Sequence, residues 1–235
     1  MKEITINSFF GYLEAVHQFS RGCFRGVPEA RYSLIPKLGR VDIARLRSAG
    51  LAYEIPEVEK TVIDTFKRSA VSFLPTVSYS EWEWLAIMQH HGAPTRLLDW
   101  SYSPLVALHF AVEGIWRGDF ATARADAAVY HLDQGIVINR RTHPDPFVLT
   151  EVALFGPPEV TPRISAQQGV FTIHPPPWTA YNTDSITKII IPGMLKTELN
   201  ERMRRLGFSH SKLFPGLDTI CFDINVACNL PAIYG

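Results

Sequence analysis

Apolar residues recur every three or four positions in five stretches of the chain, as they do along one face of an α-helix. These stretches predict helices at residues 8–19, 56–71, 80–91, 103–116 and 194–206. Ser80 and Glu83 are placed to form a capping box at the start of the third helix. Ser103 followed by Pro104 is typical of the start of the fourth.

Short runs rich in β-branched and aromatic residues predict the strands. An early strand is expected at "RGCFRGV" and a buried extended segment at "TRLLDW", and four more strands at "AAVYHLD", "VFTIH", "TKIIIP" and "DTICFDI". This order predicts an α+β fold with N-terminal helices and a mixed, largely antiparallel sheet. We expect a single domain over residues 1–235, with a loop or insertion near residues 133–162.

Composition narrows the class of protein. Of the 235 residues, 46% are hydrophobic, and 23 basic side chains balance 23 acidic ones, so the chain can bury a core but has no basic surplus for non-specific nucleic-acid binding. The three cysteines are too scattered for a disulfide framework or a zinc knuckle. No window reaches the roughly 18 apolar residues that span a bilayer, and no signal peptide is visible. We therefore expect a cytoplasmic protein without a membrane partner.

The stretch "QHHGAPTRLLDWSYSPLVALHFAV", residues 89–112, places several polar groups between two apolar segments. Arg96 can pair with a phosphate or carboxylate through two parallel hydrogen bonds, and the free N–H groups at the start of the following helix favour an anion. Alternatively, Arg96 and Asp99 form a buried ion pair or anchor the loop without binding a ligand.

His90 and His91 are neighbours on the predicted helix, about 100° apart, so they are poorly placed to share one metal ion. His91 falls on an apolar stripe with Trp84, Ile87 and Met88, which favours a core histidine as the alternative to a functional one. A site that used distant histidines, such as His109 or His174, has no supporting spacing. We expect no metal site.

Two further segments carry polar groups beside apolar strands. Arg25 lies within an apolar strand, where burial is costly unless the guanidinium is paired, and Gly26 allows close backbone approach, so both suit the floor of a ligand cleft. Arg25 facing solvent from an edge strand is the alternative. Gln167 and Gln168 precede a late strand, where an amide can orient a sugar hydroxyl or base edge, or satisfy backbone groups at the end of the sheet.

Together these segments resemble the FRG domain family, named for its Phe-Arg-Gly motif. The matching residues are "FRG" at 24–26, the stretch at 89–112, "RISAQQGVFTI" at 163–173 and "LFPGLD" at 213–218. The members of this family are mostly bacterial and phage proteins. The resemblance is compatible with a recognition module in phage defence or in a toxin–antitoxin pair.

The chain is also similar, more weakly, to ADP-ribosyltransferase folds. Those enzymes carry an arginine on a first strand, then a Ser/Thr-rich strand leading into a helix with an Ala-x-x-Phe-Ala pattern, then a catalytic Glu near a late strand. Here "FRG" at 24–26, "SYS" at 101–103 and "ALHFA" at 107–111 follow in that order. Gln167 or Gln168 stands where the Glu is expected, and an amide supplies no negative charge to a cationic transition state.

The second similarity implies an enzyme that cleaves NAD, its substrate, and transfers ADP-ribose to a protein, a nucleic acid or water, with no permanently bound cofactor. The residues implied for catalysis are Arg25, Asp99, Gln167, His90 and His91. The residues implied for substrate contacts are Phe24, Gly26, Thr95, Arg96, Trp100 as a stacking wall, Ser101, Ser103 and Gln168. The alternative is a module that binds a nucleotide or a partner without turnover. Under either hypothesis we expect Arg25, Arg96, Asp99, Trp100 and Gln167 to line one cleft.

Overall fold

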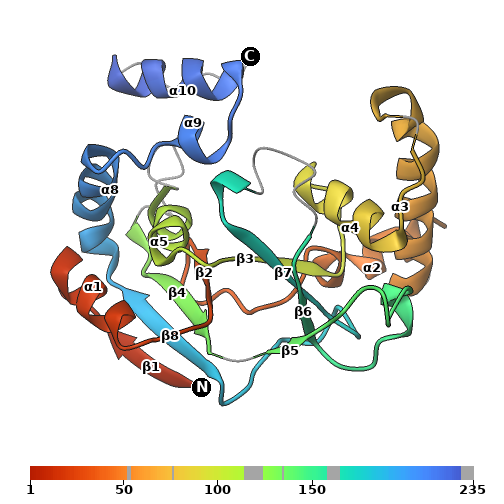
Figure 1. The fold of residues 1–235 in the computed structure, drawn as a ribbon, viewed down its shortest axis with the longest axis horizontal. Coiled ribbons are helices and arrows are strands. Elements are labelled where there is room, and N and C mark those ends of the chain that lie inside the picture. Colours follow the sequence, from red (N-terminus) through yellow and green to blue (C-terminus); the bar gives the residue numbers. More distant parts are fainter. Residues whose placement is uncertain (52–53, 76, 114–123, 134, 158–164, 229–235) are drawn as a thin grey trace.

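The computed structural model describes residues 1–51, 54–75, 77–113, 124–133, 135–157 and 165–228. Within these residues an eight-stranded sheet runs in the order β1-β8-β4-β2-β3-β7-β6-β5 (Figure 1). The strands are β1 (Lys2–Thr5), β2 (Cys23–Val27), β3 (Leu97–Ser101), β4 (Ala127–Leu132), β5 (Ile136–Val137), β6 (Ala153–Phe155), β7 (Gly169–Ile173) and β8 (Ile186–Ile191). The sheet therefore draws strands from nearly the whole described chain.

Strand pairing confirms a mixed, largely antiparallel sheet. The edge pairs β1–β8 and β5–β6 are parallel, and the pairs between them are antiparallel. The weakest junction is central: β2 and β3 share only the pair Phe24–Ser101, whereas β2 pairs over its whole length with β4 and β3 over its whole length with β7. The two halves of the sheet thus meet at one point and diverge beyond it.

Helices cover both halves. They are α1 (Phe9–His17), α2 (Ile43–Ser48), α3 (Ile55–Ala70), α4 (Glu81–His90), α5 (Pro104–Val112), α8 (Lys196–Arg205), α9 (His210–Leu213) and α10 (Leu217–Ala227). In Figure 1, α1, α5 and α8 accompany the half with β4 and β8, and α3 and α4 accompany the half with β6 and β7. The α+β class predicted from the sequence is confirmed, and none of the described helices is long and apolar enough to cross a membrane.

The predicted helix starts are confirmed where the caps are local. Ser80 and Glu83 form both hydrogen bonds of the capping box of α4. The Ser103 hydroxyl accepts a hydrogen bond from the Val106 N–H at 3.3 Å, and Pro104 is the first residue of α5. The sequence predicts these helix starts because each capping residue and its partner are only three residues apart.

The predicted strand at "DTICFDI" is wrong, because these residues form part of α10. Leu217, Ile220 and Ile224 lie at helical spacing and are 48–81% exposed, and α10 buries none of its residues. A short apolar run does not by itself distinguish a strand from a helix, and the spacing of these three residues fits a helix. The segment expected as a loop near residues 133–162 contributes β5 and β6, which form one edge of the sheet.

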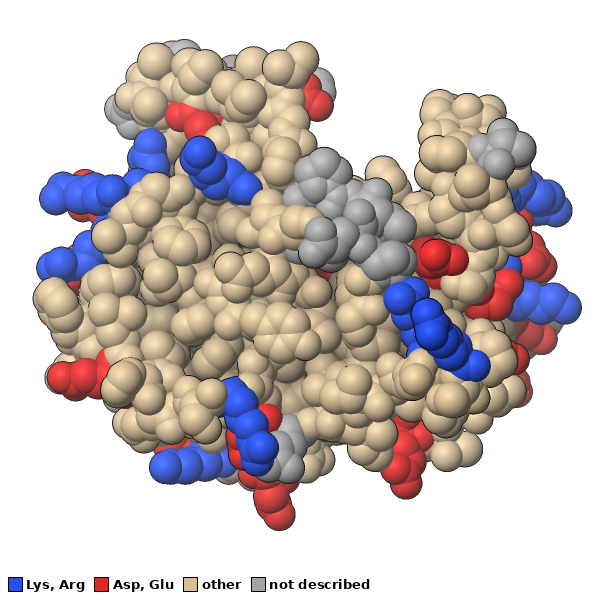
Figure 2. Space-filling model, in the orientation of Figure 1, with Lys and Arg blue, Asp and Glu red and all other residues tan. Residues whose placement is uncertain are grey.

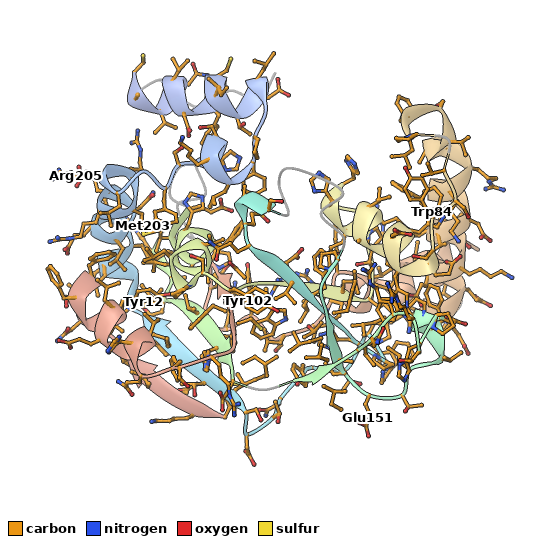
Figure 3. The ribbon with its side chains drawn as sticks, viewed as in Figure 1. Tyr12, Trp84, Tyr102, Glu151, Met203 and Arg205 are labelled. Atoms are coloured by element: carbon orange, nitrogen blue, oxygen red, sulfur yellow. The ribbon has the colours of Figure 1, made fainter. Side chains whose placement is uncertain are left out.

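One hydrophobic cluster fixes α5 against the sheet. Figure 3 labels Tyr12 on α1 and Met203 on α8, the two helices that flank α5. Both residues are fully buried, in the same hydrophobic cluster as Ala107 and Leu108 of α5. The Tyr12 hydroxyl also donates to the Pro104 carbonyl at 2.6 Å, so the start of α5 is held by a hydrogen bond as well as by packing.

Candidate functional site

A cleft of about 150 Å³ lies where β2 and β3 diverge. It receives residues from β2, β3, α5 and the segment before β7. They are Phe24, Arg25, Gly26, Asp99, Trp100, Ser101, Val106, Ala107, Phe110 and Gln167. Of the five residues expected to share one cleft, the structure brings together Arg25, Asp99, Trp100 and Gln167, and places Arg96 elsewhere.

Arg25 bridges the opening between the two strands. Its Nη1 donates to the main-chain carbonyl of Asp99 at 2.6 Å and lies 3.5 Å from the Asp99 carboxylate. The side chain is 19% exposed, and among the described residues its buried Nε has no hydrogen-bond partner. Burial lowers the pKa of Arg25, and the negative charge of Asp99 opposes that shift. A cation held this deep, with a donor unused, favours an anionic ligand.

Asp99 turns its carboxylate toward the cleft. The side chain is 52% exposed, and Oδ2 accepts a hydrogen bond from Gln89 Nε2 at 2.7 Å. Gln89 is fixed in turn by the Thr95 hydroxyl, which donates to Gln89 Oε1. The sequence offers Arg96 as the partner of Asp99. In the structure the partners are Arg25 and Gln89, because β3 carries Asp99 past β2 and α4.

Gly26 has a packing role that the sequence did not specify. A Cβ atom at this position would lie 1.9 Å from the Ala107 carbonyl oxygen of α5. Only glycine lets the backbone of α5 approach β2 this closely. Phe24, on the same face of β2, is 6% exposed within the cluster beneath α5. In the Phe-Arg-Gly motif, therefore, Phe24 and Gly26 seat the helix and Arg25 faces the strand opening.

Gln167, Ser101 and Ser103 form hydrogen bonds between the cleft and the neighbouring segments. Gln167 Nε2 donates to the Leu213 carbonyl of α9 at 2.9 Å. The Ser101 hydroxyl donates to the Gln167 carbonyl at 2.7 Å and accepts from the Ser103 N–H. Gln168 adopts a left-handed backbone with φ 46°, and its carbonyl accepts from the Tyr102 N–H at 3.1 Å. The alternative in which these residues satisfy groups at the end of the sheet is thus realised for several of them, although Ser101 and Gln167 also line the cleft.

Trp100 does not offer the stacking wall expected of it, because its side chain is buried and the residue is only 3% exposed. Its indole N–H donates to the Thr172 hydroxyl at 2.8 Å, and that hydroxyl lies 2.7 Å from His174 Nε2. Burial, together with the positive charge of the nearby Arg25, lowers the pKa of His174 to about 3. His174 is therefore neutral at pH 7 and shares a hydrogen bond with the Thr172 hydroxyl. The aromatic side chain that stays exposed next to β3 is Tyr102, labelled near the middle of Figure 3.

Arg96 belongs to a structural ion pair outside the cleft. Its Nε and Nη2 donate to the two carboxylate oxygens of Glu59 on α3 at 2.6 and 2.5 Å. The side chains of Arg96 and Glu59 are 11% and 8% exposed. The alternative in which Arg96 pairs with Asp99 is wrong, because Glu59 of α3 supplies the carboxylate.

His90 and His91 lie at the end of α4 and do not line the cleft. Their rings contact each other edge to face, with centroids 4.7 Å apart. His91 is exposed, so its expected place in the core is wrong. The buried face of α4 instead carries Trp82, Leu85, Ala86 and Met88, which pack against β3, β6 and β7.

The cleft also uses residues that were not singled out from the sequence. Gln89 orients Asp99, and Val106, Ala107 and Phe110 of α5 form the apolar wall. Gln89 directly precedes the histidine pair in the sequence, and no local pattern marks it as a partner of Asp99. The described residues also bring together one group of potential metal ligands, His109, Glu113 and His210, outside the cleft.

The face shown in Figure 2 carries its charges around the rim, where Lys and Arg alternate with Asp and Glu. On this face no broad patch of one sign appears among the described residues. An extended polyanion therefore finds no continuous basic track there. A ligand of the cleft is expected to be held by a few directed contacts, as Arg25 and Asp99 allow.

Comparison with known proteins supports part of the resemblance noted in the sequence. No curated protein and no solved structure matches the chain. Residues 20–119 match the family model of the FRG domain. The match includes Arg25, Asp99 and all of α5, and leaves Gln167 outside. The matched segment contributes most of the residues that line the cleft.

Proposed function

We propose that the cleft binds NAD and supports cleavage of its nicotinamide–ribose bond, with ADP-ribose passing to water or to a macromolecular acceptor. One observation carries the proposal: a buried arginine with an unused donor and a half-exposed carboxylate face the same small cleft. This combination suits a ligand that carries a phosphate next to a group that becomes cationic. The order of motifs shared with ADP-ribosyltransferase folds supports the same choice of ligand.

Arg25 holds the pyrophosphate in this proposal. Its Nε is buried and has no hydrogen-bond partner among the described residues, while Nη1 stays on the Asp99 carbonyl. A charge-assisted hydrogen bond from Nε to a phosphate oxygen satisfies the donor that folding left unpaired. The apolar wall of Val106, Ala107 and Phe110 then faces the nucleoside part of the ligand.

Asp99 supplies the negative charge. When the C1′–N bond breaks, its electron pair leaves on nicotinamide and positive charge develops on the ribose. A carboxylate already oriented by Gln89 stabilises that charge without reorganisation. Water or an acceptor hydroxyl then bonds to C1′ and gives up its proton, for which Asp99 is the nearest base in the cleft.

A second candidate, a recognition module that binds a nucleotide without turnover, is favoured by Gln167. In the motif order that resembles ADP-ribosyltransferase folds, Gln167 or Gln168 stands where those enzymes carry Glu, and the Gln167 amide donates to the Leu213 carbonyl. With an amide there, Asp99 is the one carboxylate among the described cleft residues. If Asp99 is too far from the bound ribose, the same cleft binds and does not cleave.

The test is incubation with NAD and quantitation of released nicotinamide, together with calorimetric binding. Turnover that Arg25→Ala abolishes supports the enzyme. Binding without nicotinamide release supports the recognition module, and absence of binding contradicts both. Arg202→Ala on the surface of α8 is the matched control, because it removes a cation 46% exposed and remote from the cleft. Because Arg25 joins two strands, the thermal unfolding of each variant is measured alongside.

A further inference from the structure

His109, Glu113 and His210 converge on one point although their sequence positions gave no sign of it. His109 and Glu113 are four residues apart on α5 and its C-cap, so they share one face of the helix. His210 is the first residue of α9 and approaches from the other side. Their ligand atoms all lie within 4.8 Å of one another. We refer to these three residues as the α5–α9 cluster.

The separations within the α5–α9 cluster suit a shared metal ion better than direct hydrogen bonds. His109 Nε2 lies 3.4 Å and His210 Nδ1 lies 3.7 Å from the same oxygen, Glu113 Oε2. Both distances exceed the usual 2.7–3.2 Å of a hydrogen bond. Ligands bound at about 2.0–2.1 Å to a tetrahedral Zn²⁺ ion lie about 3.3–3.4 Å from each other. Small side-chain movements would bring the three atoms onto such an ion.

His109 supplies an independent observation that points to a ligand. Its side chain is 5% exposed, and among the described residues neither ring nitrogen has a hydrogen-bond partner. A buried imidazole normally has at least one hydrogen bond, because leaving both nitrogens unsatisfied is costly. Bonding of Nε2 to a metal ion would give one of the two nitrogens a partner.

The cavity beside the cluster matches the one water molecule that would complete the coordination of a bound ion. A cavity of about 20 Å³ is lined by the three ligands together with Asn200, Arg204, Ser209 and Asp223. Asn200 is 2% exposed, and its Nδ2 has no hydrogen-bond partner among the described residues. A polar cavity of this size accommodates about one water molecule. The His210 ring is fixed by stacking on Phe214, with centroids 4.3 Å apart.

We infer that the α5–α9 cluster binds one divalent transition-metal ion of the Zn²⁺ class. The ligands are His109 Nε2, Glu113 Oε2 and His210 Nδ1, and a water molecule next to Asn200 completes a tetrahedron. Two imidazoles and one carboxylate favour Zn²⁺ over Mg²⁺ or Ca²⁺, which prefer oxygen ligands alone. The expectation from sequence spacing that no metal site exists did not anticipate that α9 folds against α5.

The inferred metal would clamp the C-terminal helices to the wall of the cleft. Phe110 lies next to His109 on α5 and lines the cleft, and its ring meets Phe214 edge to face at 5.8 Å. The Leu213 carbonyl of α9 accepts the hydrogen bond from Gln167. An ion that joins α5 to α9 therefore holds both Phe110 and Gln167 in place. The metal site does not depend on what the cleft binds.

The test uses the full chain after treatment with a chelator. Calorimetric titration with Zn²⁺ alone is expected to give one site per chain and a raised melting temperature. Co²⁺ in place of Zn²⁺ is expected to give the visible bands of a tetrahedral nitrogen and oxygen site without a sulfur charge-transfer band, which excludes binding by Cys221 or Cys228. His210→Ala is expected to weaken Zn²⁺ binding at least about 100-fold, since second-shell changes alone cost 10–100-fold.

Matched variants separate the site from general effects. His17→Ala removes an exposed histidine on α1 and is expected to leave the affinity for Zn²⁺ unchanged. Glu113→Gln keeps the shape of a ligand and removes its charge, so it serves if His210→Ala unfolds the chain. Circular dichroism in the presence of chelator compares the folding of His210→Ala and Glu113→Gln with that of the wild type. Absence of a stoichiometric site, or equal affinity in the wild type and both ligand variants, would overturn the inference and leave an ion-paired cluster.

Discussion

The guanidinium of Arg25 donates to the main-chain carbonyl of Asp99 at 2.6 Å, across the opening where β2 and β3 separate. The two residues are 74 positions apart. One contact therefore joins the two halves of the sheet and also places a cation beside the Asp99 carboxylate. Any variant of Arg25 affects both roles, so Asp99 offers the cleaner probe of the cleft.

Asp99→Asn is expected to lower nicotinamide release by about 100-fold or more if the cleft cleaves NAD, because it removes the charge that stabilises the ribosyl cation. The free energy of unfolding should change by about 1 kcal/mol or less, since the carboxylate is half exposed. Asp133→Asn is the matched control: its side chain is also 52% exposed, and it lies 3.6 Å from an arginine. Equal turnover in the wild type and Asp99→Asn would show that Asp99 takes no part in the reaction.

Gly26→Ala is expected to destabilise the fold by about 3 kcal/mol or more, because the added Cβ would lie 1.9 Å from the Ala107 carbonyl and α5 would have to move. Chemical denaturation measures the loss. Gly156→Ala provides the comparison, since a Cβ there meets nothing within 4 Å. If the two variants prove equally stable, the close approach of α5 to β2 does not require glycine.

The buried pair of Arg96 and Glu59 is expected to be structural. Arg96→Met leaves a carboxylate that is 8% exposed without its partner and should cost about 3–5 kcal/mol of unfolding free energy. The double variant Arg96→Met with Glu59→Leu should recover most of that loss, because neither charge then remains buried. Arg202→Ala, which breaks the exposed pair with Glu198, should cost less than about 1 kcal/mol. A double variant as unstable as the single one would contradict this interpretation.

His174 is expected to make stability depend on pH. Its pKa in the folded state is about 3, below the ordinary value of 6.5, because it is buried. Between these two pH values the unfolded chain binds a proton that the folded chain does not. The stabilising contribution is therefore complete above about pH 6.5 and is lost as the pH falls toward 3, at about 1.4 kcal/mol per pH unit.

His174→Gln tests this dependence, because its amide oxygen can still accept the Thr172 hydroxyl hydrogen while the side chain does not titrate. Unfolding free energies measured from pH 7 to pH 5 should fall less steeply in the variant than in the wild type. Parallel profiles would show that His174 does not control the acid sensitivity of the fold.

Local signals in the sequence were sufficient for the helices with clear caps, for most strands and for the α+β class. The capping box of Ser80 and Glu83 and the cap of α5 at Ser103 depend on residues three positions apart. They can therefore be predicted without knowing the tertiary structure. The Phe-Arg-Gly motif and the polar stretch after α4 were also recognisable. Arg25, Asp99 and Gln167 do line one cleft, as their positions beside apolar strands predicted.

Only the tertiary structure decided which groups are partners. Arg25 rather than Arg96 meets Asp99, and Glu59 from α3 meets Arg96, because strand pairing and helix packing bring distant segments together. The requirement for glycine at position 26 follows from the packing of α5 on β2. The proximity of His109 and His210 follows from the position of α9 next to α5. A side chain of one residue type accepts many partners, and the choice depends on long-range packing that no local pattern in the sequence encodes.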